Sequence, residues 1–145
     1  TELGGAILPC IEVQHDEEYE RYGIITGESI RDGVMKMDGL VEKPGKERAA
    51  SNFASVGGYL LTPDVFDYIE KGIKTIREGD EFYLTTYGIE PMIRAGVPHY
   101  ACLLQNSKYH DTGNKLEYIK TVVEFALKHE DIKDEFGKYL RNMVQ

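Results

Sequence analysis

Five short runs of apolar residues, bounded by glycine, proline or charged positions, recur along the first 104 residues. Runs of this length and boundary type predict β-strands. We expect strands at residues 5–13, 22–26, 34–43, 53–61 and 97–104. Asp38-Gly39 is a turn signal, which would make 34–43 a hairpin arm or two short strands. Residues 27–31, which follow the second run, are polar and are not expected to continue it.

Helical spacing of apolar residues begins after Thr62-Pro63, a pair that predicts a helix start because threonine caps helices and proline fits their first turn. Further helices are expected at residues 82–94, at 114–129 and from 131 onward. Pro91 should kink or split the first of these. Because strands come early and then alternate with helices, the pattern predicts an α/β or α+β protein.

The chain has 145 residues, which is enough for one domain, over residues 1–145, with a hydrophobic core. Its formal net charge of −8 argues against nucleic acid or an anionic membrane as the partner, because both attract basic surfaces. A small anionic ligand needs only a local cation. No apolar stretch approaches the ~20 residues of a membrane span. The first residues also lack the features of a signal peptide.

The two cysteines, Cys10 and Cys102, each lie in an apolar, strand-like run. Widely separated thiols of this kind are typical of the reducing cytoplasm, where disulfides are rare. No Cys-x-x-Cys or His/Cys spacing accompanies them, which argues against a metal pair. We therefore expect a cytoplasmic protein with two free, buried thiols.

Glu42 and Lys43 close an apolar run that Pro44 ends. Neighbouring side chains on a strand point to opposite faces, so these two can serve one ligand only at a strand end, where the backbone turns. Pro44 supplies such an end, because it cannot continue a β-ladder. The carboxylate could then bind sugar hydroxyls while the ammonium meets a phosphate. A solvated Glu-Lys pair is the structural alternative.

Asp111 lies between a predicted strand and a long predicted helix. Ligands of α/β sheets bind beyond the carboxyl ends of the strands, and a carboxylate there can hold Mg²⁺ together with phosphate oxygens and water. The alternative is a loop aspartate that caps the helix from Asn114. We expect the neighbouring His110 to be a solvated loop histidine, with catalysis as the alternative.

Two glycine positions are further candidates. Tyr22-Gly23 begins a strand, where a glycine lets the backbone approach a ligand; a plain turn is the alternative. Gly57-Gly58 interrupts a predicted strand, which indicates either a close approach to the backbone or a bulge. No serine or cysteine nucleophile motif and no glycine-rich phosphate loop is present. Phosphate would therefore be bound through a lysine and a metal ion.

The order and spacing of these segments resemble the sugar nucleotidyltransferases, and most closely the bacterial-type UTP–glucose-1-phosphate uridylyltransferases (UDP-glucose pyrophosphorylases). The resemblance covers nearly the whole chain. It is carried by Tyr22-Gly23, Val41-Glu42-Lys43-Pro44, Gly57 with Tyr59, Tyr109-His110-Asp111-Thr112-Gly113-Asn114-Lys115 with Tyr118, residues 122–128, Glu135-Phe136 and Tyr139-Leu140.

The resemblance implies an α/β fold, namely the C-terminal part of a Rossmann-like nucleotide-diphospho-sugar transferase with a mixed sheet flanked by helices. It also implies a reaction in which UTP and glucose 1-phosphate give UDP-glucose and pyrophosphate, with Mg²⁺ as cofactor. Glu42 would bind glucose hydroxyls, Lys43 the sugar phosphate, and Asp111 the Mg²⁺ as one of two carboxylates. Lys43 and Asp111 are thus the catalytic candidates. The other substrate-binding candidates are Tyr22, Gly23 and Gly57.

The chain departs from the family pattern in three places, one of which is Pro91 within a predicted helix. It lacks the G-x-G-[TS]-R nucleotide loop and the other metal aspartate of the family's N-terminal half, so it corresponds to the C-terminal, sugar-binding portion. We expect no turnover by the isolated chain. Where relatives often carry Gln-Leu-Thr-Asp, this chain has Tyr83-Leu84-Thr85-Thr86, which weakens the case for polar roles at positions 83 and 86.

Absence of the N-terminal half would expose sheet edges, so we expect a homo-oligomer or pairing with that half. Two alternative functions stay open. One is a non-catalytic sugar-phosphate-binding or assembly module built on the same half-fold. The other is thymidylyl or cytidylyl transfer to a sugar 1-phosphate, because the base is read in the absent half.

Overall fold

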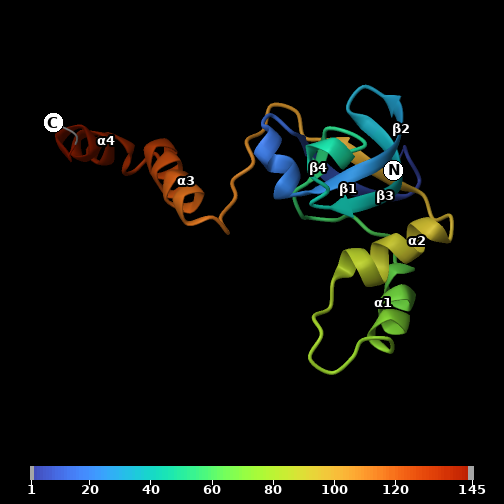
Figure 1. Ribbon diagram of the computed structural model, residues 1–145. Helices are drawn as coiled ribbons and strands as arrows, with labels where there is room; N and C mark the ends of the chain where they lie inside the picture. The colour runs from blue at the N-terminus through green and yellow to red at the C-terminus, as the bar shows by residue number, and fades with distance from the viewer. Residues whose placement is uncertain (1, 144–145) are drawn as a thin grey trace. The chain divides into compact units, whose positions relative to one another are not determined.

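The computed structural model describes residues 2–143 and separates into two compact units, Thr1–Ser107 and Lys108–Gln145. The first unit contains five strands and the helices α1 and α2, and the second contains α3 and α4 (Figure 1). The single domain expected over residues 1–145 stays a prediction.

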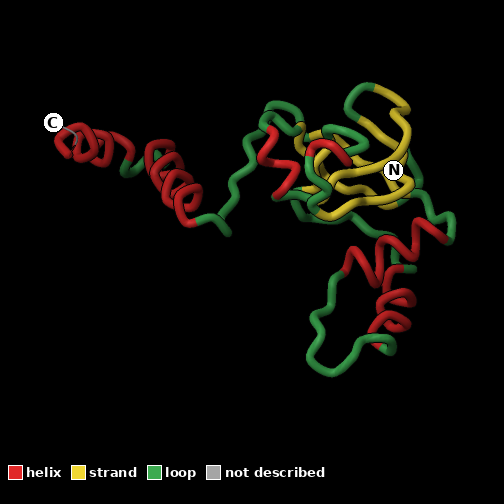
Figure 2. The backbone as a smooth tube through the Cα atoms, viewed as in Figure 1, coloured by secondary structure: helices red, strands yellow, loops and turns green. Residues whose placement is uncertain are grey.

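The five strands close into a barrel in the order β1-β4-β2-β3-β5. Figure 2 shows these strands in yellow. Their bounds are Ala6–Glu12 for β1, Gly23–Arg31 for β2, Val34–Glu42 for β3, Phe53–Ser55 for β4 and His99–Leu103 for β5. Strands β1 and β5 pair in parallel, whereas the other neighbours are antiparallel. The predicted mixed sheet is therefore confirmed.

The core follows from alternation along these strands. In β1 every second residue is buried from Ala6 to Cys10, as expected of a strand with one face turned inward. The main cluster of buried side chains consists of Leu8, Cys10, Ile25, Met35, Met37 and Ala101. These residues come from four of the five strands, so closing the barrel is what buries them.

The hairpin between β2 and β3 turns at Asp32-Gly33, so the predicted turn at Asp38-Gly39 is wrong. Arg31 pairs with Val34, and the two-residue loop between them uses a positive φ of 67° at Gly33. Asp38 is instead an extra residue in β3, because Thr26 pairs with Gly39 while Gly27 pairs with Met37. The hydroxyl of Thr26 donates to the carboxylate of Asp38 and closes this bulge.

Strand β2 also extends beyond residue 26 through the polar stretch 27–31, which was not predicted as strand. These residues are exposed, so they carry no apolar pattern, and their pairing with β3 holds them extended. For β4 the predicted strand was too long rather than too short. Only Phe53–Ser55 of the predicted run 53–61 is strand, followed by a single bridge between Leu60 and Ile7. Gly57 and Gly58, both with φ of 82°, end the strand.

Helix α1 (Val65–Ile73) begins two residues later than predicted from Thr62-Pro63, with Thr62 accepting a turn hydrogen bond from the Val65 amide. The predicted helix 82–94 is split, as expected. A π-helical turn, η3 (Thr85–Ile89), precedes α2 (Glu90–Arg94), and Pro91 lies in the first turn of α2. Helix α1 packs closely on η3, and α2 packs on β3.

In the second unit α3 (Lys115–Lys128) and α4 (Lys133–Met143) form as predicted and pack on one another. Asn114 caps α3, because its side chain accepts from two amides of the first turn. Across residues 2–143, no helix combines the length and apolar character needed to cross a membrane.

Each of the five described strands has two neighbours in the closed barrel. The exposed sheet edges that motivated an expectation of self-association are therefore not found among these strands. The physical reason is that β4 and β5 return to β1, which removes the edges that an open half-sheet would have. The oligomeric state stays a prediction without that support.

Cys10 and Cys102 are both free, as predicted, but only Cys10 is completely buried. Burial raises the pKa of the Cys10 thiol to about 12. At pH 8 only about 10⁻⁴ of this thiol is ionised, and the thiolate is the reactive form. We therefore expect iodoacetamide at pH 8 to alkylate the partly exposed Cys102 first, and Cys10 only in denaturant, as read by peptide mass spectrometry. A native Cys102→Ser variant that reacts rapidly would contradict this expectation.

Candidate functional site

Three strand ends meet at one edge of the barrel. Gly23, the first residue of β2, pairs with Glu42 at the end of β3 and with Ser55 at the end of β4. Gly57 follows two residues after Ser55. The fold thus brings together five sequence-predicted candidates from segments that are far apart along the chain. We call them the strand-end site: Tyr22, Gly23, Glu42, Lys43 and Gly57.

Lys43 turns the chain where β3 ends. Its φ of 46° lies in the left-handed region, which among residues 2–143 only one other non-glycine residue adopts. The turn lets two consecutive side chains converge, with Lys43 Nζ 3.4 Å from Glu42 Oε1. The predicted turn is therefore present, and it brings the Glu42 carboxylate and the Lys43 ammonium close together. Their roles in binding stay a prediction.

Backbone hydrogen bonds hold this turn. The amide of Lys43 donates to the carbonyl of Tyr22 at 3.2 Å, and the amide of Gly45 donates to the carbonyl of Tyr19 at 3.2 Å. Tyr19 belongs to η1 (Asp16–Glu20), a short 3₁₀ helix with three acidic residues in its first turn. A left-handed lysine persists only where its surroundings enforce it, and these two bonds supply that enforcement.

Arg48 is a further support that the sequence pattern did not identify. It closes η2 (Lys46–Arg48), and its Nε donates to the carbonyl of Pro44 at 2.8 Å. Lys46 adds an exposed ion pair with Asp16 at 2.7 Å, which contributes little by itself. The only sequence signal for Arg48 was its place in a charged loop shortly after Lys43.

Gly23 leaves room for the carboxylate of Glu42. A Cβ atom at Gly23 would lie 3.1 Å from Glu42 Oε2 and 2.9 Å from Leu40 Cδ2. Gly23 is an extended strand residue and not a turn glycine, so the turn alternative is wrong. A side chain at position 23 would crowd Leu40 most closely and the Glu42 carboxylate next, so the glycine leaves space for both of these side chains.

Gly57 faces open space. A Cβ atom built there would meet no atom of the described chain within 4 Å, and the same holds for Gly58. The two residues lie beyond the end of β4, so they are not a bulge within a ladder. An approaching ligand could reach the backbone at this point without displacing any described side chain.

The Glu42–Lys43 pair is exposed, with side-chain exposures of 66% and 56%, so the pair adds little to the stability of the fold. A neighbour is Tyr83, whose hydroxyl donates to Glu81 Oε2 at 2.6 Å. This hydrogen bond raises the pKa of Tyr83, and the charge of Glu42 contributes to the shift as well.

Asp111 belongs to the second unit, where its carboxylate oxygen Oδ1 accepts from the amide of Gly113 at 3.1 Å. The alternative role as the cap of α3 is wrong, because Asn114 is the cap. Across residues 2–143, no group of three or more His, Cys, Asp or Glu side chains could hold a metal ion. The role of Asp111 as a metal ligand stays a prediction.

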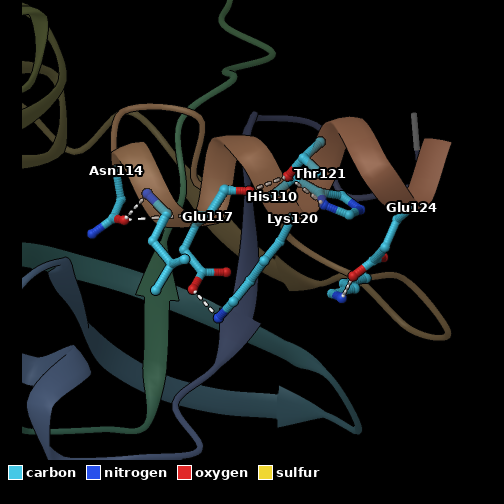
Figure 3. Close-up of polar contacts among 8 residues, drawn as sticks. His110, Asn114, Glu117, Lys120, Thr121 and Glu124 are labelled. Carbon is cyan, nitrogen blue, oxygen red and sulfur yellow. Dashed lines mark hydrogen bonds and ion pairs between the residues drawn. The ribbon is translucent and has the colours of Figure 1, made fainter. Parts of the chain in front are cut away.

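His110 differs from the solvated histidine that was expected. Its Nδ1 lies 3.0 Å from Thr121 Oγ1 on α3 (Figure 3). Its ring also lies 5.4 Å from the ring of Phe125. The sequence did not predict this contact, because α3 carries several polar residues and nothing distinguishes Thr121 among them.

Residues 2–128 match the family model described as nucleotidyl transferase. The chain belongs to the nucleotidyl transferase family. The resemblance predicted from the motifs is therefore confirmed, and members of this family typically use a divalent metal ion.

Two curated relatives of this nucleotidyl transferase are named UTP–glucose-1-phosphate uridylyltransferase. The protein from Staphylococcus haemolyticus is 37% identical over 144 residues, which are 98% of this chain and 47% of the relative. The protein from Streptococcus pneumoniae is 36% identical over 137 residues, which are 93% of this chain and 42% of the relative. The chain thus spans about half the length of the curated relatives it matches.

Solved structures agree with this assignment. A UDP-glucose pyrophosphorylase complexed with UDP-glucose matches with a TM-score of 0.72 and 30% identity, over 86% of this chain and 45% of that one. The enzyme from Acinetobacter baumannii matches with a TM-score of 0.75 and 27% identity, over 96% of this chain and 46% of that one. The predicted fold class, an α/β nucleotidyltransferase fold with a mixed sheet and flanking helices, is confirmed, and the correspondence to the C-terminal part stays a prediction.

Proposed function

We propose that this chain forms the sugar-phosphate half of an enzyme that converts UTP and glucose 1-phosphate to UDP-glucose and pyrophosphate. The observation that carries the proposal is the convergence of Glu42 and Lys43 at the left-handed turn, beside the space left by Gly23. One carboxylate and one ammonium a few ångströms apart match a ligand that carries hydroxyls at one end and a phosphate at the other. The names of the relatives support the same reaction.

Each residue then has a distinct role. The Glu42 carboxylate accepts hydrogen bonds from glucose hydroxyls, while the Lys43 ammonium orients the phosphate of glucose 1-phosphate for in-line attack on the α-phosphate of UTP. The backbone at Tyr22-Gly23 contacts the sugar, and Gly57 lines its pocket. Asp111 would hold Mg²⁺, which would supply charge neutralisation at the reacting phosphates.

We further propose Mg²⁺ as the family's divalent metal here, cytoplasmic action, and assembly as a homo-oligomer or with a nucleotide-binding half. The free thiols support a reducing compartment. The carboxylate of Asp111 is a hard oxygen donor of the kind that Mg²⁺ takes, and this ion usually completes its coordination with phosphate oxygens and water. The isolated 145-residue chain is expected to form no UDP-glucose. We refer to this chain joined to its nucleotide-binding half as the complete enzyme.

The proposal is tested by Glu42→Gln in the complete enzyme. Removing the charge while keeping the shape should weaken the hydrogen bonds to glucose, each worth about 1.5–3 kcal/mol when one partner is charged. We expect kcat/KM for glucose 1-phosphate to fall about 10–100-fold, with KM for UTP unchanged. Initial rates of pyrophosphate release measure both constants.

Glu28→Gln is the matched control, because Glu28 is an exposed glutamate of the same hairpin, on β2. If the two variants had equal kcat/KM for glucose 1-phosphate, Glu42 would not bind the sugar. Binding of glucose 1-phosphate without any UDP-glucose formation by the complete enzyme would favour the non-catalytic module. Turnover with thymidine or cytidine triphosphate in place of UTP would favour the other base-specific transfers.

A further inference from the structure

The segment that carries Asp111 is tied to α3 by side chains that the proposed reaction does not use. Lys108 forms a hydrogen-bonded ion pair with Glu124, and this contact lowers the pKa of the Glu124 carboxyl. His110 reaches the second turn of the helix, where its Nδ1 lies 3.0 Å from Thr121 Oγ1 (Figure 3). Both contacts lie within the second unit.

The direction of the His110 hydrogen bond follows from what Thr121 does with its own proton. Thr121 Oγ1 donates to the carbonyl of Glu117 at 2.7 Å, and a hydroxyl has only one proton to donate. Thr121 must therefore accept from His110, so Nδ1 carries the hydrogen. Both the neutral Nδ1–H imidazole and the imidazolium carry it, so the contact does not depend on the charge of His110.

A second anchor lies on the other side of Asp111. The side chain of Asn114 accepts from the amides of Leu116 and Glu117 at 2.9 and 3.2 Å. Glu117 therefore takes part in both anchors, through its amide to Asn114 and through its carbonyl to Thr121. The short segment that holds Asp111 is thus fastened at both ends to the same two turns of α3.

We propose that His110 is a positioning residue for Asp111, fastening the metal-binding segment to α3 through Thr121. This inference rests on the proposed role of Asp111 as a metal ligand. Groups that orient a metal ligand typically change metal affinity or activity 10–100-fold when they are lost. His110 acts on the backbone next to the ligand and not on its carboxylate, so we expect an effect at the lower end of that range.

Three variants separate the hydrogen bond from the packing of the ring. His110→Phe keeps a ring against Phe125 but removes the Nδ1–H donor, and Thr121→Val removes the acceptor. His110→Asn keeps an N–H donor close to the position of Nδ1 and loses the ring. In the complete enzyme with Mn²⁺ as the probe metal, we expect His110→Phe and Thr121→Val to raise the half-saturating Mn²⁺ concentration about 10-fold.

The test compares the half-saturating Mn²⁺ concentration among the variants. His110→Asn should stay close to the wild-type protein, and the double variant His110→Phe/Thr121→Val should be no worse than either single one, because the two residues form one contact. The turnover number at saturating Mn²⁺ should change little. Lys120→Met is the matched control, since Lys120 lies on the same helix and pairs only with the side chain of Glu117 among the contacts drawn in Figure 3.

A spectroscopic readout is independent of turnover. In the ¹⁵N-labelled 145-residue chain, NMR of the His110 ring should show a protonated Nδ1, and Thr121→Val should abolish that preference. A neutral ring protonated only on Nε2 would overturn the inference. So would a normal Mn²⁺ requirement in both His110→Phe and Thr121→Val when Asp111→Asn raises that requirement. If Asp111→Asn itself leaves the metal requirement unchanged, the proposed function fails at that residue and the positioning role falls with it.

Discussion

Replacing Lys43 by glycine is expected to lower kcat/KM of the complete enzyme about 10²–10³-fold, the usual cost of losing one group that stabilises charge in a transition state. The same change should not destabilise the fold. Lys43 holds a φ of 46°, a conformation that costs a side-chain-bearing residue about 1–2 kcal/mol and glycine almost nothing. The lysine therefore opposes stability at the position where we expect it to serve catalysis.

Comparison with Lys43→Ala isolates this strain. Both variants lose the ammonium, so their activities should fall equally, but alanine keeps the strained conformation. We expect the glycine variant to unfold with a free energy about 1 kcal/mol higher than the alanine variant, after allowing for the greater freedom of glycine in the unfolded chain. Urea denaturation followed by circular dichroism measures the difference.

Asn106→Gly is the matched control, because Asn106, with φ of 54°, is the other non-glycine residue of the described chain in this region. Asparagine tolerates that region, so its replacement should change stability less, and activity should stay near the wild-type value. If Lys43→Gly kept full activity, the assignment of the phosphate site to Lys43 would be wrong. If the glycine and alanine variants were equally stable, the turn would hold no strain.

The largest expected effect on stability belongs to Gly27→Ala in the β2–β3 hairpin. A Cβ atom at Gly27 would lie 2.0 Å from the carbonyl oxygen of Lys36, and the φ of 149° is itself one that side-chain-bearing residues rarely adopt. The clash is with backbone, so relief requires the two paired strands to separate locally. We expect a loss of about 3 kcal/mol or more in the free energy of unfolding.

Gly79→Ala separates the clash from the backbone strain. Gly79 has a φ of 94°, but a Cβ atom there would meet no described atom within 4 Å. Its replacement should therefore cost only the strain, about 1 kcal/mol. Guanidinium unfolding of both variants gives the comparison, and similar losses at positions 27 and 79 would show that the hairpin can relax around the added methyl group.

The positions of most elements could be predicted from local patterns. The alternation in β1, the apolar run of β5 and the capped start of α3 are each determined by neighbouring residues, because burial periodicity and capping act over a few positions. The motifs that carry the family resemblance are local for the same reason. The candidate residues could therefore be identified before any of them was placed in space.

Local sequence patterns did not predict correctly how the strands pair. Two Asp-Gly pairs, at 32–33 and 38–39, carry the same turn signal, and only the register between β2 and β3 decides that the first is the turn and the second lies at a bulge. The exposed stretch 27–31 carries no apolar signal and becomes strand because β3 pairs with it. The bounds of β4 likewise depend on two glycines whose conformation the sequence leaves free.

The sequence by itself determined which residue types are available for sugar, phosphate and metal, and on which elements they lie. Only the tertiary structure decided that Gly23, Glu42 and Ser55 lie in one row, that Lys43 turns back toward Glu42, and that His110 is fastened to Thr121. These contacts join residues separated by eleven or more positions, except the one at Lys43, whose left-handed turn is imposed by bonds to distant segments. Local preference cannot specify such contacts, because their free energy exists only once the barrel has closed and the segment before α3 has folded onto its helix.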